Sequence, residues 1–499
     1  MTAAPGAYRH DELVSVGIAA TTFSKSPNMA QLLQKAYTRL VSGVLFPLHE
    51  RAKRHTTVAV RRGMEDSQWW LRERLEALRI ERLRALLWHA QQFVPYYRNR
   101  FGERGLDARE VRDISILQRL PLLSKADIRA HLEQLRSERA VDLARFNTGG
   151  SSGEPLVFLV GRERVSHDVA AKWRATRWWG VDIGDPEIVV WGSPIELGAQ
   201  DRMRSVRDRL LRTRLLPAFE MSEVNLDKFV AAIRKARPAM LFGYPSSLAL
   251  IARHAEQRGR CMDDLGIRVA FVTSEKLYNH QREAISRIFG CAVANGYGGR
   301  DAGFIAHECP AGGMHITAED IIVETVGPEG FATAPGEPGE IVVTHLATKD
   351  FPFIRYRTGD IGVLEDRACP CGRGLPLLGD VQGRTTDFVV AADGTTMHGL
   401  ALIYVLRDTP GIEAFKIIQE SLSLTRVLLV PGAGYGDATR RRIEEGLKAR
   451  LGKSVNVLVV EVARIDPERS GKFRYVVSEV AQLSPLTVNP GASATAEAR

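Results

Sequence analysis

The chain lacks any apolar run long enough to cross a bilayer. Its uninterrupted apolar stretches, such as VLFPL from Val44, fall far short of the ~20 residues that a membrane-spanning helix needs. The first thirty residues carry His10, Asp11 and Glu12 and have no basic segment followed by a long apolar core, so they do not resemble a signal peptide. We therefore expect a cytoplasmic protein without a transmembrane helix.

Cysteine is scarce, and the net charge is small for a chain of this size. Five cysteines among 499 residues exclude a disulfide scaffold. A net charge of +9 within 25% charged residues of both signs is the content of an ordinary enzyme, so we expect no nucleic-acid partner.

Part of the positive charge is local, because six arginines lie between residues 202 and 214. They alternate with apolar residues such as Met203, Val206 and Leu210, a pattern typical of a solvated amphipathic helix. Peripheral contact with phospholipid or with an anionic polymer is the alternative. The arginines are Arg202, Arg204, Arg207, Arg209, Arg212 and Arg214.

The length predicts at least two domains. Residues 1–70 are weakly patterned and form an N-terminal extension. Within residues 71–387, leucines at helical spacing between Leu71 and Pro95 predict a helix, and Ser124 with Asp127 has the spacing of a capping box. Short apolar runs such as EIVVWG and VAFVTS then alternate with helical stretches, which predicts an α/β layered domain.

The composition changes after Gly383. Residues 388–484 have four strand-like runs around a helix whose apolar face is Ile443, Leu447 and Leu451, so they predict a small α+β domain. The last segment, 485–499, is rich in Ala, Ser and Pro and predicts a disordered tail.

The first chemical signal is TGGSSGEP at residues 148–155, between two apolar stretches. Three glycines and three hydroxyls let backbone amides and side chains turn toward a polyphosphate without steric hindrance. The loop lacks the GK[ST] ending of a Walker loop, and a surface turn is the alternative.

The second signal is a series of three short motifs: YRTGD at 356–360, GRTTD at 383–387 and SGKFR at 470–474. Asp360 can accept hydrogen bonds from both ribose hydroxyls, and Arg384 can add a cationic donor. Lys472, on a separate domain, can be brought to a reaction centre by domain movement. Each motif alone is an ordinary turn, but their order and separations are jointly specific.

With these motifs the chain resembles the adenylate-forming superfamily, and within it the phenylacetate–CoA ligase branch that includes CapK proteins. The resemblance runs from about residue 75 to 480 and includes LLWHAQQFVPYYR, LPLLSKADIR, FGYPSS, TSEKL, YGGRD and CPCGRGLP. It implies a large N-terminal α/β region of adenylate-forming type, joined at a hinge, Asp387, to a small mobile C-terminal α+β lid.

The resemblance also implies roles for single residues. Ser274, Glu275 and Tyr297 would border the adenine, and Asp301 would hold Mg²⁺. Asp360 and Arg384 would bind the ribose, while Lys472 would bridge the substrate carboxylate and the α-phosphate of ATP. The residues that would embrace the triphosphate are Thr148, Gly149, Gly150, Ser151, Ser152 and Gly153.

Three positions depart from the pattern of the superfamily. Glu154 stands where many relatives have lysine, Arg300 where Ser or Thr is commoner, and Asp301 where Glu is usual. Arg300 can supply the cation that Glu154 does not, so we place it with Lys472 among the candidate catalytic residues. Neutralising charge is necessary because a carboxylate must approach an anionic phosphate. An inactive or altered nucleotide site is the alternative.

The cysteines suggest a separate metal site. Cys309, His315, Cys369 and Cys371 supply three thiolates and one imidazole, the ligand set of a closed structural zinc site. Free thiols on loops are the alternative, and His307 or His345 could replace His315. Cys261 and Cys291 are expected to pack singly as small apolar residues.

The implied reaction converts a small carboxylic acid and MgATP to acyl-AMP and pyrophosphate, and transfer of the acyl group to coenzyme A is the primary second step. One alternative is CapK-like transfer to an amine, for example on a surface polysaccharide. Another is a non-catalytic scaffold held at a membrane by residues 202–214. Segments 191–195 and 242–247 are expected to carry pocket residues, but the sequence identifies neither the acid nor the oligomeric state.

Overall fold

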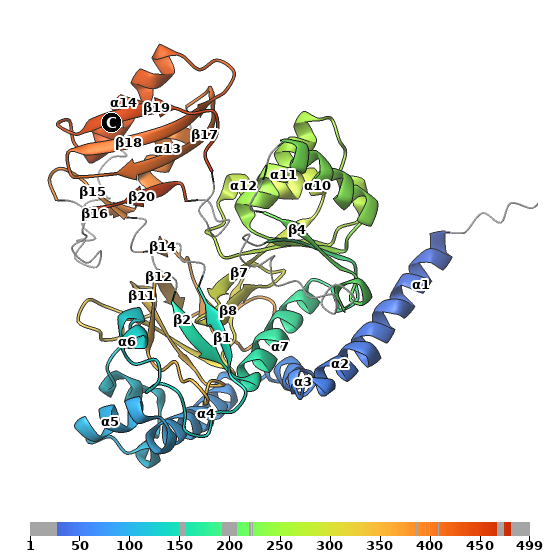
Figure 1. Ribbon diagram of the computed structural model, residues 1–499, viewed down its shortest axis with the longest axis vertical. Coiled ribbons are helices and arrows are strands. Elements are labelled where there is room, and N and C mark those ends of the chain that lie inside the picture. The colour runs from blue at the N-terminus through green and yellow to red at the C-terminus, as the bar shows by residue number, and fades with distance from the viewer. Residues whose placement is uncertain are drawn as a thin grey trace, which may run out of the picture.

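The computed structural model describes residues 27–148, 156–191, 207–218, 221, 223–384, 388–394, 396–398, 400–407, 409–466 and 474–480. These residues form a large α/β region and a smaller C-terminal α+β region, which confirms the predicted fold class (Figure 1). None of the helices in this described part of the chain is long and apolar enough to span a membrane.

The N-terminal residues are helical, although their weak patterning indicated no elements. They form α1 (Pro27–Leu40), the π-helical turn η1 (Val41–Leu45), α2 (Phe46–Ala52) and α3 (Thr57–Ser67). Met64 of α3 is buried against Ala170 and Ala171 of α7 (Arg162–Trp178), so α3 is part of the large region's core. The boundary at residue 70 stays a prediction.

The next helices match the sequence expectations. Helix α4 (Arg72–Phe93) buries its leucines, and Pro95 begins α5 (Pro95–Glu103). Ser124 and Asp127 form the predicted capping box of α6 (Lys125–Ala130). Two short 3₁₀ turns, η2 (Ala108–Glu110) and η3 (Ile114–Arg119), lie between α5 and α6.

One half of the main sheet is parallel. Its strands lie in the order β4 (Thr213–Pro217), β3 (Glu187–Trp191), β5 (Met240–Gly243), β6 (Val269–Thr273) and β7 (Ala292–Gly299). All residues of β5 and β6 are buried, as expected for central parallel strands covered on both faces. The connecting helices are α10 (Glu223–Ala236), α11 (Pro245–Gln257) and α12 (Asn279–Phe289), with the turn η4 (Asp263–Leu265) before β6.

The other half of the sheet is antiparallel and continues from β7. The order is β8 (Gly303–Glu308), β9 (Met314–Ile316), β13 (Leu377–Leu378), β12 (Tyr356–Glu365), β11 (Pro338–His345) and β10 (Ile321–Val326). Strand β14 (Gly383–Arg384) pairs with β12 beside this path. A separate hairpin, β1 (Ala144–Asn147) and β2 (Val157–Val160), flanks the loop at 148–156.

The C-terminal region, which we call the lid, has its own sheet and core. Strands β19 (Asn456–Glu461), β18 (Leu424–Pro431), β17 (Ile412–Gln419) and β20 (Val476–Ser478) pack against α13 (Leu400–Arg407) and α14 (Asp437–Leu451). A two-stranded ladder, β15 (Phe388–Val390) with β16 (Thr396–His398), precedes them. Ile443, Leu447 and Leu451 are fully buried, as their spacing predicted.

The arginine-rich segment does not form one helix through residue 214. Residues 207–210 are helical, but Thr213–Pro217 forms β4, so Arg214 lies on a strand. Parallel pairing with β3 supplies backbone hydrogen bonds that override the helical pattern. Arg202 and Arg204 lie outside the described residues.

Candidate functional site

Strand pairing brings the two predicted ribose residues together. Asp360 on β12 lies directly opposite Arg384 on β14 in an antiparallel ladder. The hydroxyl of Tyr297 on β7 donates to Asp360 Oδ2 at 2.8 Å. Burial, and then the neighbouring Asp360 carboxylate, raises the pKa of Tyr297 well above its usual range, so this phenol stays a hydrogen-bond donor at neutral pH. The carboxylate of Asp360, which is predicted to bind the ribose, is thus held in a fixed orientation.

Asp301 lies in the turn between β7 and β8 and is held from two sides. The hydroxyl of Tyr356, the first residue of β12, donates to Asp301 Oδ2 at 2.5 Å, and the amide of Ala302 donates to Oδ1 at 3.1 Å. An oriented carboxylate of this kind is a suitable hard ligand for Mg²⁺.

The turn that carries Asp301 is itself anchored by α7. Nη2 of the buried Arg164 donates to the carbonyl of Asp301 at 3.3 Å and to that of Arg300 at 3.5 Å, while its Nε donates to Asp168 Oδ2 at 2.8 Å. The charge of this buried arginine is balanced by Asp168. Arg164 is therefore a positioning residue for the turn.

The residues predicted to border the adenine directly follow β6. Ser274 has a φ of +72°, a left-handed conformation that a residue with a Cβ adopts only when its surroundings hold it. Glu275 Oε2 accepts a hydrogen bond from the amide of Ser246, in the first turn of α11, at 3.2 Å. This contact joins the two segments FGYPSS and TSEKL.

The phosphate loop is described only at its ends. Thr148 closes the β1–β2 hairpin: its amide donates to the carbonyl of Leu156 and its hydroxyl accepts from the amide of Leu156, both at 2.9 Å. The exposed Arg300 donates from Nη1 to the carbonyl of Asn147 at 3.4 Å, which places its guanidinium at the base of the loop. Gly149, Gly150, Ser151, Ser152, Gly153 and Glu154 lie outside the described residues.

The lid contacts the large region beside the adenine residues. The ring of Tyr475 meets that of Tyr278, four residues after Ser274, edge-on at 5.6 Å, and lies 6.4 Å from that of His280. Lys472 and the hinge residue Asp387 lie outside the described part of the chain, as does the pocket segment 192–195.

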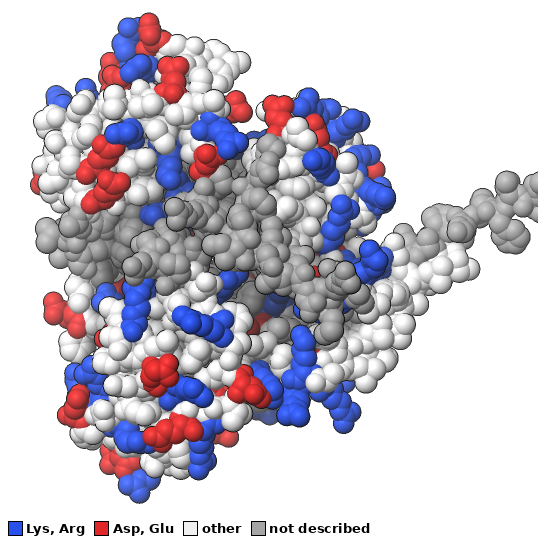
Figure 2. Space-filling model, in the orientation of Figure 1, with Lys and Arg blue, Asp and Glu red and all other residues white. Residues whose placement is uncertain are grey.

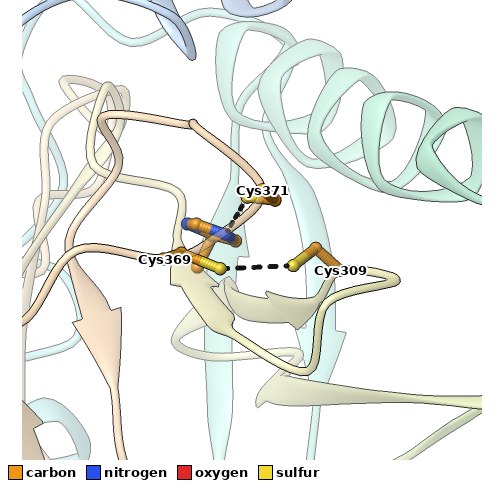
Figure 3. A group of neighbouring side chains, drawn as sticks. Cys309, Cys369 and Cys371 are labelled. Carbon is orange, nitrogen blue, oxygen red and sulfur yellow. Dashed lines mark hydrogen bonds between the residues drawn. The ribbon is translucent and has the colours of Figure 1, made fainter.

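The predicted metal ligands form a compact cluster. The ligand atoms of Cys309, His315, Cys369 and Cys371 all lie within 4.8 Å of one another. The two sulfurs of Cys309 and Cys369 are 3.7 Å apart, and His315 Nε2 is 3.1 Å from Cys371 Sγ (Figure 3). Two thiolates bound to one tetrahedral zinc at ~2.3 Å would lie about 3.8 Å apart, so the spacing suits that ion.

Local backbone geometry assembles this cluster. His315 lies on β9, which pairs with β13 just after the loop carrying Cys369 and Cys371, and Cys309 follows β8. A Cβ added at Gly313 would lie 2.6 Å from Cys369 Sγ, so only glycine fits there. His315 Nδ1 lies 3.2 Å from the carbonyl of Leu375, which directs the Nε2 lone pair toward the sulfurs. Burial lowers the pKa of His315 to about 4, so the ring is neutral, as a ligand must be.

The alternative histidines and the remaining cysteines are placed elsewhere. His307 is buried beside Phe271 and Phe304, and His345 lies 3.7 Å from Asp168, so neither replaces His315. Cys291 is buried alone, as expected. The prediction that Cys261 packs as a small apolar residue is wrong. Cys261 is exposed, and its thiol donates a hydrogen bond to Asp263 Oδ1.

Several known proteins resemble this chain over most of its length. Residues 389–479 match the family model of the CapK C-terminal domain. A phenylacetate-coenzyme A ligase of Thermus thermophilus is 28% identical, over 81% of this chain and 97% of that protein. Protein CapK of Staphylococcus aureus is 22% identical, over 77% of this chain and 85% of that protein. The solved structure of 2-hydroxyisobutyryl-CoA ligase in the postadenylation state matches with a TM-score of 0.67 at 19% identity. The match covers 83% of this chain and 91% of that structure.

Together these likenesses fit the adenylate-forming superfamily. The assignment rests on relatives that cover most of the chain and on a shared fold that includes the C-terminal region.

Two residues that hold the Asp301 turn in place were not predicted from the sequence. Tyr356 stands in the YRTGD motif, but it lies 55 residues after Asp301 in the sequence, so their contact leaves no local signal. Arg164 lies 137 residues before the turn that it supports, on a helix whose pattern shows only burial.

Proposed function

We propose that this chain uses MgATP to convert a carboxylic acid to acyl-AMP and then transfers the acyl group to coenzyme A. In the first step a carboxylate oxygen attacks the α-phosphorus and pyrophosphate leaves. In the second step the thiol of coenzyme A attacks the acyl carbon and AMP leaves. Relatives named phenylacetate-coenzyme A ligase support this assignment.

The observation that carries the proposal is the junction of β7, β12 and β14. It combines Asp360, opposite Arg384 and fixed by Tyr297, with an independently fixed second carboxylate, Asp301. Two oriented carboxylates close to a Gly/Ser/Thr loop suit a nucleotide and its metal ion.

Charge neutralisation would come from three groups. Asp301 would hold Mg²⁺, whose chemistry is to neutralise phosphate oxygens. Arg300 would add a cation at the base of the phosphate loop, since its guanidinium reaches the carbonyl of Asn147. Lys472 would act on the carboxylate and the α-phosphate. Its assignment is supported by Tyr475, three residues later, which packs on Tyr278 beside the adenine residues.

The two-part organisation serves this chemistry. We propose that the large region, 71–387, binds ATP and the acid, and that the lid, 388–484, moves about Asp387 between the two steps. The separate core of the lid supports this division.

We also propose that Cys309, His315, Cys369 and Cys371 bind one structural Zn²⁺. The sulfur spacing and the imidazole oriented by Leu375 support this site. Four protein ligands leave no open position, so the ion would tie the β8–β9 turn to the loop before β13 and would take no part in catalysis.

Acid-dependent exchange of labelled pyrophosphate into ATP, measured over a panel of aryl and short aliphatic acids, tests the first step. Adding coenzyme A or amines to active mixtures identifies the acceptor. The second candidate acceptor is an amine, for example on a surface polysaccharide. No exchange with any acid would instead favour the non-catalytic scaffold.

A further inference from the structure

The N-terminal helices form an arm that is anchored by one face only. Thr38 on α1 donates to Asp185 Oδ1 at 2.8 Å, and Tyr37 donates to the carbonyl of Leu210 at 2.8 Å. Val41 is buried against Gly184, where an added Cβ would lie only 2.6 Å from the valine Cβ. In Figure 1 the arm projects from the body along α2 and α1.

The opposite face of α1 is apolar and exposed. Met29, Leu32, Leu33 and Leu40 have helical spacing that puts them on one side, away from Thr38. Each is between 47% and 65% exposed. Val44, Leu45 and Leu48 continue the exposed apolar surface along η1 and α2. We call these seven residues the arm stripe, and each of them is at least 36% exposed among the described residues.

The arm stripe differs from the other exposed apolar residues. Large hydrophobic side chains such as Val224 and Phe331 are exposed singly, which is normal for a globular protein. The arm stripe, by contrast, has seven exposed apolar side chains within twenty residues, four of them on one side of α1. A continuous exposed stripe of this size indicates a binding surface.

Within the arm, between Pro27 and Thr56, the exposed charges are all positive. Between Pro27 and Thr56 the only acidic residue is Glu50, which is buried and bonded to His49, His55 and Thr57. Arg209 is exposed next to Leu210, whose carbonyl binds Tyr37, so the arginine-rich segment adds to this charge. Figure 2 shows the visible face of the arm without acidic side chains. The exposed basic residues of the arm are Lys35, Arg39, Arg51, Lys53 and Arg54.

We propose that the arm docks the protein on an anionic lipid surface. The arm stripe would enter the boundary between headgroups and acyl chains, and the basic residues would contact the headgroups. Pairing of two copies through the same face fits less well, because it would bring the exposed cations of both copies together without an acidic counterpart.

Vesicle sedimentation of the full chain tests the proposal. At low salt the protein should bind vesicles of phosphatidylcholine with about 30% phosphatidylglycerol, and 0.5 M salt should weaken that binding. Each basic residue near such a surface contributes about five-fold in affinity, so K35E/R39E should lose at least about 25-fold. L32Q/L33Q should lose about ten-fold or more, because two leucines would no longer leave water.

Matched variants elsewhere provide the controls. R441E/R442E on the exposed face of α14 changes the net charge equally and should bind like the parent, as should V224Q. Circular dichroism melting checks that every variant folds. Absence of sedimentation by the parent, equal binding to vesicles of phosphatidylcholine alone, or normal binding by K35E/R39E would overturn the proposal. A parent dimer that L32Q/L33Q converts to monomer, seen by light scattering, would assign the face to a second copy instead.

Discussion

Replacing Tyr356 with phenylalanine removes one hydroxyl from the candidate magnesium site and little else. The ring is fully buried and packs edge-on against Phe353 at 5.1 Å, so phenylalanine should occupy the same space. What is lost is the 2.5 Å hydrogen bond to Asp301 Oδ2. Asp301 keeps the amide of Ala302 on its other oxygen, but its carboxylate can then rotate.

A hydrogen bond to a charged group contributes about 1.5–3 kcal/mol. If that energy orients Asp301 for Mg²⁺, Tyr356→Phe should reduce acid-dependent pyrophosphate exchange roughly 10- to 150-fold at limiting Mg²⁺. Excess Mg²⁺ should restore part of the rate, because the weakened step is metal binding. The assay is an exchange titration with Mg²⁺ at saturating ATP.

Tyr97→Phe is the matched control. The Tyr97 hydroxyl is also buried, donating to the carbonyl of Pro352 at 3.1 Å and accepting from the amide of Ile354 at 3.2 Å, but it contacts no predicted nucleotide residue. Its loss should lower stability and leave the Mg²⁺ requirement unchanged. The reasoning about Asp301 is refuted if Tyr356→Phe shows the parental exchange rate and Mg²⁺ requirement.

Three further predictions concern metal content, charge and pH. Cys371→Ser should lower both the zinc content and the melting temperature, whereas Cys261→Ser at the surface should lower neither. The zinc content is measured by elemental analysis of protein purified without chelator. A parent protein without stoichiometric zinc would exclude the site. Arg300→Ala should slow pyrophosphate exchange about 10²–10³-fold if its cation is used in the transition state, and an unchanged rate would remove it from the mechanism. Burial, and then nearby Arg164, lowers the pKa of His345 to about 4, so the neutral ring stabilises the fold fully above pH 6.5 and loses that effect as the pH falls toward 4. When the pH falls from 7.5 to 5.5, the free energy of unfolding should therefore decrease more in the parent protein than in His345→Gln. The difference should be up to about 1.4 kcal/mol for each pH unit below 6.5. Denaturant titrations at the two pH values measure it, and equal decreases would contradict the prediction.

Periodicity predicted the elements that bury a regular apolar face. Helix α14 buries Ile443, Leu447 and Leu451, and β6 is a continuous buried run. The arm escaped prediction because it reverses this rule: α1 anchors through Thr38 and Tyr37 while its leucines face outward. An apolar pattern in the sequence does not reveal which face meets the core.

In the candidate site, too, some residues could be predicted from the sequence and others could not. Resemblance could locate Asp360 and Arg384, and their pairing across β12 and β14 agrees with a shared ligand. It could not assign Tyr356 or Arg164, because their contacts with the Asp301 turn depend on strands and helices far apart in sequence. Only the structure distinguishes His315 from His307 and His345 as the metal ligand, since all three histidines are buried.

Pyrophosphate exchange by Lys472→Ala tests whether Lys472 is the cation that supports formation of the acyl adenylate. The variant should exchange pyrophosphate at least 10²–10³-fold more slowly than the parent. Its ATP affinity should be nearly unchanged, because Asp360 and Arg384 would still hold the ribose. Given synthetic acyl-AMP and coenzyme A, the variant should keep most of the thioester-forming activity, because in the proposed mechanism Lys472 would act only in adenylation. A Lys472→Ala variant that adenylates its acid at the parental rate would contradict the account.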